Sequence, residues 1–212
     1  MPPTSHLLTF TITAWLIIVV PGPSVLFTVS RAIALGRIAG IATVAGNTVG
    51  AFTQTVAVAY GLGPLVERSV LLFTVLKLAG AGYLIFLGVQ AIRHRHSLAE
   101  ALTATVERKS AARIVLDGFT VGATNPKVIV FFAAILPQFT DRQAGHVPVQ
   151  IVVLGAVFAG IALLSDGAWA LAAGTVRAWF TRSRRRLELI GGTSGLVMIG
   201  IGVRLALTGR RD

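Results

Sequence analysis

A proline-glycine-proline break within a long apolar run constrains the fold of this sequence most strongly. The run extends from about Leu7 to Ser30, and Pro21-Gly22-Pro23 interrupts it just before Ser24. Proline lacks an N–H and its ring clashes with the preceding turn, so a regular helix cannot pass this point. In a membrane, the freed backbone groups must be buried in protein or line a wet cavity. Because the run is long enough to cross a bilayer, we interpret the break as part of an intramembrane site.

A second break of the same kind, Asn125-Pro126-Lys127, lies near the middle of a later apolar run. A single intramembrane proline is more often a kink that serves packing. Two breaks near the midplane, both flanked by polar residues, favour function, because transporters commonly bind their cargo at discontinuous helices. The pair therefore predicts a pseudo-symmetric transporter. The alternative is that both prolines only kink helices for packing.

The composition indicates an integral membrane protein and excludes several kinds of chemistry. Only 13% of the 212 residues are charged, against roughly 25% in a soluble domain. The mean hydropathy is +0.79. The absence of cysteine excludes disulfides and thiolate metal sites. The sequence has no Walker-type phosphate loop, no metal-ligand spacing and no nucleophile–histidine pairing, so we expect no enzyme, no cofactor and no metal.

Six apolar segments are each long enough to cross a bilayer. We expect spans at about 7–30, 38–62, 69–92, 114–139, 148–176 and 189–207. Three spans separate the two breaks, and an odd number inverts the direction of the chain. The expected fold is an all-α integral membrane protein with six transmembrane helices in two inverted three-helix repeats, in which helices 1 and 4 are broken. The repeats cover residues 1–92 and 114–212, and a basic linker at 93–113 joins them.

The net charge of +11 reflects topology and lipid headgroups, and we expect no nucleic-acid partner. Sixteen of the 19 Lys and Arg residues lie between the apolar segments or in the tail. Twelve of these lie in the first, third and fifth loops, including the run Arg182–Arg186, which we interpret as a topology anchor. By the positive-inside rule these loops face the cytoplasm, and both termini face outside.

A few charged and amide side chains lie within the apolar segments, where burial is costly unless they are paired. They include Lys77, Lys127, Asp117, Asp166, Asn47, Gln54 and Asn125. Lys77 or Lys127 facing Asp166 would remove most of the cost of burial. Such a pair belongs either to a transport site or to a purely structural ion pair, and the amides either contact cargo or only bridge helices.

Several glycine pairs are spaced four residues apart, which places two small residues on one helix face and lets another backbone approach. They are Gly36/Gly40, Gly46/Gly50, Gly118/Gly122 and Gly191/Gly195. We expect packing positions here. The alternatives are a moving interface and a homodimer contact.

Several motifs together resemble the LysE/RhtB family of amino-acid exporters over nearly the whole chain. They are Pro21-Gly22-Pro23, Asn125-Pro126-Lys127, Leu136-Pro137-Gln138-Phe139, Leu76-Lys77 with Gly80-Ala81, Tyr83-Leu84 and Leu87-Gly88, and the glycines Gly36, Gly40, Gly46 and Gly61. The resemblance implies a multi-pass protein of the bacterial inner membrane. It also implies export of amino acids driven by the proton motive force.

We therefore expect a secondary transporter that exports neutral amino acids of the threonine, homoserine or branched-chain type, since no surplus deep carboxylate is present to hold a cationic side chain. The expected substrate-binding residues are Pro21, Gly22, Pro23, Ser24, Asn47, Lys77, Asn125, Pro126 and Lys127. Asp166 is the expected proton carrier, and Asp117 is a second candidate. The alternatives are a basic amino acid or another small solute as cargo, and a passive channel.

Overall fold

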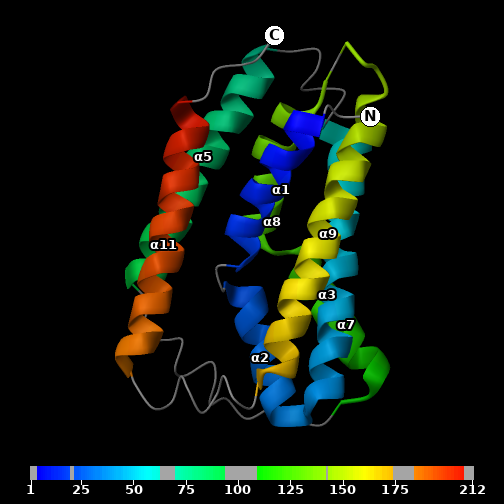
Figure 1. Cartoon of the computed structure of the whole chain (residues 1–212), viewed down its shortest axis with the longest axis vertical. Coiled ribbons are helices and arrows are strands. Elements are labelled where there is room, and N and C mark those ends of the chain that lie inside the picture. Colours follow the sequence, from blue (N-terminus) through cyan, green and yellow to red (C-terminus); the bar gives the residue numbers. More distant parts are fainter. Residues whose placement is uncertain are drawn as a thin grey trace.

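A computed structural model shows the chain as an elongated bundle of helices (Figure 1). The structure describes residues 4–19, 22–62, 70–93, 109–141, 143–173 and 184–207. Within these ranges the regular structure is helical and no strand occurs, which confirms the all-α class. Pro21, most of the expected linker at 93–113, and Arg182 lie outside the described residues.

The first apolar run forms two helices, α1 (Thr4–Val19) and α2 (Pro23–Leu35), inclined to each other by 51°. Helix α2 begins with proline, which suits the first helical position because the N–H there has no partner within the helix. Gly36 then turns the chain with a φ of 95°, in the left-handed region that favours glycine. Helix α3 (Arg37–Ala57) follows and continues into the π-helical turn η1 (Val58–Leu62).

The fourth expected span is broken in the same way. Helix α7 (Ala111–Ala123) ends before Asn125, and α8 (Pro126–Val130) begins after it at a bend of 43°. The π-helical η2 (Phe131–Ile135) and the 3₁₀-helical η3 (Leu136–Phe139) continue α8. Both proline motifs of the sequence therefore separate two half-helices.

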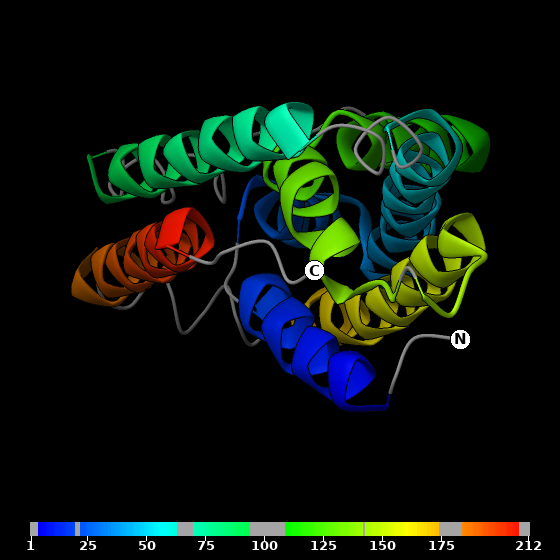
Figure 2. The same cartoon turned by 90° about the horizontal axis from the view of Figure 1, so that it is seen from above.

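Three long helices complete the bundle: α5 (Val70–Arg93), α9 (Val147–Leu171) and α11 (Arg184–Leu207). Helix α3 packs against α2, α7 and α9, whereas α5 packs along α11 at one side of the molecule (Figure 2). Successive segments run in alternate directions, so the beginning of α1 and the end of α11 lie at the same end of the bundle (Figure 1). This arrangement places the two helix breaks in its middle.

Part of the expected membrane topology is supported by length and composition. Among the described residues, α9 alone is long and apolar enough to cross a membrane. The bent pairs α1–α2 and α7–α8, the latter extended to Phe139, qualify if each is counted as one span. The other three expected spans, and the inverted repeat, stay predictions.

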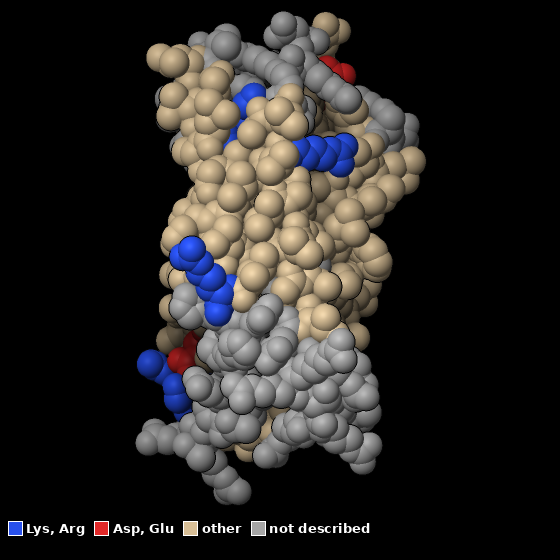
Figure 3. Space-filling view, turned by 90° about the vertical axis from the view of Figure 1, so that its left-hand side faces the viewer, with Lys and Arg blue, Asp and Glu red and all other residues tan. Residues whose placement is uncertain are grey.

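The surface and part of the interior differ from those of a soluble protein. Large apolar side chains such as Ile38 (88% exposed) and Leu164 (77% exposed) face outward. Lysine, arginine, aspartate and asparagine side chains are buried inside, as Lys127 and Asp166 illustrate. On the face formed by the left-hand side of the bundle in Figure 1, an uncharged band separates an upper from a lower group of charged side chains (Figure 3). Such a surface fits a hydrocarbon environment.

Helices α3 and α7 lie backbone against backbone because glycine occupies their contact. A Cβ atom at Gly46 would overlap the carbonyl oxygen of Val115, and one at Gly122 would overlap that of Asn47. Gly50 and Gly118 are equally constrained by the facing backbone. The predicted packing role of these two glycine pairs is confirmed.

The same kind of contact joins α5 and α11. A Cβ at Gly88 would lie 2.6 Å from the carbonyl oxygen of Gly195, and one at Gly202 would lie 2.8 Å from that of Ala81. A Cβ at Gly36, in contrast, would have no atom within 4 Å, so the presence of glycine there is explained by its backbone angle.

Replacing Gly122 by alanine is expected to destabilise the protein, because the new methyl group forces α3 and α7 apart. Overpacking of this kind costs about 1–3 kcal/mol. The matched control is Gly160→Ala on α9, where no atom lies within 4 Å of the added Cβ. We would measure thermal unfolding of the purified variants in detergent. Equal midpoints for Gly122→Ala, Gly160→Ala and the wild type would show that the α3–α7 contact is looser than described.

Candidate functional site

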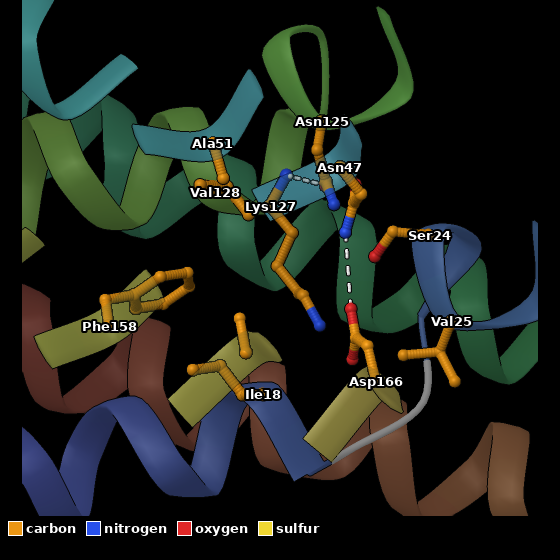
Figure 4. A pocket seen from close by; sticks show the side chains of 11 residues that line it. Ile18, Ser24, Val25, Asn47, Ala51, Asn125, Lys127, Val128, Phe158 and Asp166 are labelled. Atoms are coloured by element: carbon orange, nitrogen blue, oxygen red, sulfur yellow. Dashed lines mark hydrogen bonds between the residues drawn. The ribbon is translucent and has the colours of Figure 1, made fainter. Parts of the chain in front are cut away.

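The two helix breaks adjoin one buried cavity in the middle of the bundle (Figure 4). Its polar lining comes from four segments and consists of Ser24, Asn47, Asn125, Lys127 and Asp166. None of these residues is more than 6% exposed. The rest of the lining is apolar and consists of Ile18, Val25, Ala51, Val128, Phe158 and Ala162. Segments far apart in the sequence therefore converge on one site.

Lys127 stabilises the end of the helix at the first break. Its Nζ donates a hydrogen bond of 3.0 Å to the carbonyl oxygen of Ile17, in the last turn of α1. Carbonyl groups in a last turn have no partner within the helix, and they carry the negative end of the helix dipole. A Cβ at Gly22 would lie 3.1 Å from the same Nζ, so glycine leaves room for the ammonium group.

The second break is stabilised by amide side chains. The Nε2 of Gln54 on α3 donates a hydrogen bond of 2.7 Å to the carbonyl oxygen of Gly122, at the end of α7. The Oδ1 of Asn125 accepts a hydrogen bond of 3.1 Å from the backbone N–H of Lys127 and so caps the start of α8. In this conformation Gln54 bridges helices, and Asn125 shapes the break while also facing the cavity.

Asn47 and Asp166 connect α3 and α9 across the cavity. The Nδ2 of Asn47 donates a hydrogen bond of 3.2 Å to Oδ2 of Asp166. In the described part of the chain, the buried Oδ1 of Asn47 has no hydrogen-bond partner. An unsatisfied buried acceptor is costly, so this oxygen is well placed to accept from a ligand. The ammonium group of Lys127 and the carboxylate of Asp166 point into the same space (Figure 4).

The cavity is closed in this conformation. The space open to the centre of a water molecule is about 20 Å³, and a single water needs roughly 10–15 Å³ by the same measure. An amino acid does not fit into this volume. Binding of a solute of that size requires the helices around the breaks to move apart.

Other expected site residues lie away from the cavity lining. Lys77 is partly exposed on α5 and does not line the cavity. Asp117 on α7 belongs to an ion cluster with three cations, and its carboxylate oxygens lie 2.8 Å from Arg31 Nη2, 2.6 Å from Lys109 Nζ and 3.2 Å from Arg113 Nε. Gly22 and Pro126 form the breaks without lining the cavity, Pro23 is the first residue of α2, and Pro21 lies outside the described residues.

Sequence reasoning missed two features of this region. Arg31 directly follows the expected first span at 7–30 and so counts among the basic residues of the first loop. It is nevertheless only 6% exposed, and its guanidinium lies 4.9 Å from the centre of the Phe27 ring. The apolar lining was also missed. Helical spacing could have revealed it, because Ala162 and Phe158 lie four and eight residues before Asp166 on α9.

Known proteins match the chain over almost its whole length. The LysE type translocator family matches residues 15–209. A homoserine/homoserine lactone efflux protein of Salmonella typhimurium is 32% identical over 197 residues, which cover 93% of this chain and 94% of that protein. A protein of Vibrio cholerae described as an uncharacterized membrane protein is 34% identical over 200 residues, covering 94% and 95% of the two chains.

A leucine efflux protein of Klebsiella pneumoniae is 28% identical over 204 residues, which cover 94% of this chain and 93% of that protein. No solved structure matches the chain. The family match extends over both helix breaks and every residue that lines the cavity. This chain therefore belongs to the family of LysE type translocators.

Proposed function

We propose that this protein is a secondary transporter that exports neutral amino acids across the bacterial inner membrane. The observation that carries the proposal is the buried cavity between two broken helices, which presents an ammonium group and a carboxylate to the same space. These charges complement the carboxylate and ammonium groups of a zwitterion. The homoserine and leucine efflux proteins among the relatives support this class of cargo.

Each end of a zwitterion has a partner in the lining. The cargo carboxylate would bind the ammonium group of Lys127, aided by the partial positive charge at the start of α2. The cargo ammonium would donate to Asp166 and to the unsatisfied Oδ1 of Asn47. Asp166 is the only carboxylate among the residues described as lining the cavity, so none is left for a cationic side chain. This charge balance favours a neutral amino acid over a basic one.

Correspondence between the two breaks supports an inverted repeat of residues 1–92 and 114–212, with the linker at 93–113. Aligning Gly22-Pro23 with Asn125-Pro126 pairs Ser24 with Lys127, and both of these residues line the cavity. The hydrogen bond between Asn47 and Asp166 joins the second helix of one repeat to the second of the other. A site shared by two such repeats suits alternating access, in which the cavity opens to one side at a time.

Asp166 is the proposed proton carrier. It lies next to the cargo site and is hydrogen-bonded to Asn47, so its charge affects both cargo binding and the contact between α3 and α9. Asp117 fits this role less well, because three cations already hold its carboxylate away from the cavity. Proton binding at Asp166 would weaken its attraction for the cargo ammonium and so favour release.

The ion pair of Arg31 and Asp117 closes one end of the site by joining α2 to α7. This end carries Lys109 and Arg113, and the positive-inside rule assigns it to the cytoplasm. Opening towards the cytoplasm must separate Arg31 from Asp117. The carboxylate keeps Lys109 and Arg113 as partners after separation, so opening does not leave an unpaired aspartate.

Lys127→Ala should reduce amino-acid efflux at least about tenfold, which corresponds to about 1.4 kcal/mol, because the cargo carboxylate and the end of α1 both lose their partner. We would measure efflux from cells loaded with dipeptides of homoserine, leucine and lysine, at matched membrane abundance. Lys77→Ala is the control, since Lys77 does not line the cavity. Export of lysine but not of homoserine or leucine would contradict a neutral cargo. No export of any amino acid would refute the proposed function.

Asp166→Asn is expected to impair the coupling of efflux to protons without abolishing the exchange of amino acids across the membrane. The amide keeps the hydrogen-bonding size of the side chain but cannot carry a proton, so proton-driven efflux should fall while exchange of internal for external amino acid persists. Proteoliposomes with and without an imposed pH gradient would distinguish the two activities. Full proton-driven efflux with unchanged pH dependence would show that Asp166 is not the proton carrier. A wild type that only equilibrates its cargo under a pH gradient would indicate a passive channel.

Arg31→Gln should make the cavity more accessible from the cytoplasm, because it removes the ion pair between α2 and α7. The protein has no native cysteine, so Ser24→Cys introduces a unique label site in the cavity. We would follow its reaction with an impermeant maleimide in inside-out vesicles, where we expect labelling at least about fivefold faster, or about 1 kcal/mol. Arg37→Gln, at an exposed position, is the control. Equal labelling rates in all three backgrounds would rule out a closing role for this ion pair.

A further inference from the structure

The cavity has a polar end and an apolar end. Figure 4 shows Asn125, Asn47, Ser24 and Asp166 on one side, whereas Ala51, Val128 and Phe158 lie on the other side of the Lys127 side chain. A zwitterion whose charged groups bind at the polar end would direct its side chain towards the apolar end. The residues there determine which side chains fit.

The residues of helix α9 that line the cavity give the distances along it. Asp166, Ala162 and Phe158 are spaced four residues apart on one face, and all three line the cavity. A rise of 1.5 Å per residue places Ala162 about 6 Å and Phe158 about 12 Å from Asp166 along the axis. Ala51 lies one turn from Asn47 on α3 and adds a second small residue at the intermediate level.

An aliphatic amino acid matches these distances. A hydrogen bond that the cargo ammonium donates to Asp166 spans about 2.8 Å. Bonds of about 1.5 Å give the cargo an extension of roughly 5 Å from its nitrogen to the end of a leucine-sized side chain. Together these lengths, roughly 8 Å, reach beyond Ala162 and end before Phe158. An aromatic side chain extends roughly 1.5 Å further than leucine, so a carbon–carbon contact distance of about 3.5–4.0 Å no longer fits between it and the level of Phe158.

Phe158 is held in place by its neighbours, so it cannot easily move aside. Its ring centre lies 4.8 Å from that of Phe132 in an edge-to-face contact, and 5.4 Å from that of Phe131. Both neighbouring rings are fully buried. Phe131 in turn contacts Phe10 on α1. The aromatic cluster therefore forms a packed wall behind the apolar end of the cavity.

We propose that Ala51, Ala162 and Phe158 form a side-chain subsite, and that Phe158 sets the largest amino-acid side chain that the protein exports. The inference rests on the proposed function, since it assigns the apolar end of the same cavity. Residues of leucine size and smaller are accepted once the helices around the breaks have moved apart, because two alanines line the middle level. Phenylalanine and tryptophan are rejected by the fixed ring at the end.

The test uses purified protein in proteoliposomes loaded with radiolabelled homoserine, leucine or phenylalanine. Phe158→Ala should raise the ratio of phenylalanine to leucine efflux at least about tenfold, or about 1.4 kcal/mol. Ala162→Leu makes the subsite smaller instead of larger and should reduce leucine efflux much more than homoserine efflux. Phe158→Leu provides a milder enlargement that keeps an apolar side chain against Phe132, in case the alanine variant does not fold.

Leu164→Ala is the matched control, because it shortens an outward-facing side chain of the same helix. We expect its substrate ratios to equal those of the wild type. Unchanged ratios in the folded Phe158 and Ala162 variants, on a protein that exports leucine, would overturn the subsite alone. If the wild type exports none of the three probes, the proposed function is overturned and the subsite with it.

Discussion

The hydrogen bond from Lys127 to the carbonyl oxygen of Ile17 is the interaction on which the rest of this site depends. Breaking a helix in an apolar interior leaves carbonyl groups that need partners. Lys127, which belongs to the other broken helix, is the partner of one such carbonyl group, so the two breaks are held against each other. The same ammonium group faces Asp166 across the cavity (Figure 4). A cargo carboxylate that binds Lys127 must therefore compete with the end of α1, which links cargo binding to the position of that helix.

The sequence predicted those parts of the site that depend on local chemistry. Proline motifs identified both breaks, because the missing N–H and the ring clash act within one turn. The rarity of deep charges identified Lys127 and Asp166. The choice between Lys77 and Lys127 as the partner of Asp166 could not be made, because it depends on how helices are rotated about their axes. Arg31 was misplaced for a related reason, since its ion pair with Asp117 exists only after α2 and α7 have packed.

Two kinds of contact surround the cavity, and they differ in how readily they can separate. The glycine contacts of α3 with α7 are backbone against backbone, and those of α5 with α11 combine backbone carbonyl groups with isoleucine side chains. The contact of α2 with α7 includes the ion pair of Arg31 and Asp117, which can separate while the aspartate keeps other partners. The cavity is closed at about 20 Å³, so some of these contacts must separate before cargo can enter. Contacts formed by side chains separate more readily than contacts formed by glycine.

The glycine contacts also determine which parts of the chain can move as units. Helix α3 precedes the linker in sequence and α7 follows it, yet Gly46 and Gly122 hold these helices together. Gly88 and Gly195 do the same for α5 and α11. Each of these tightly packed pairs therefore joins a helix that precedes the linker to a helix that follows it. An exporter built in this way would not be divisible at its central loop into two separately folding fragments, and each fragment made alone would expose glycine-lined grooves shaped for the other.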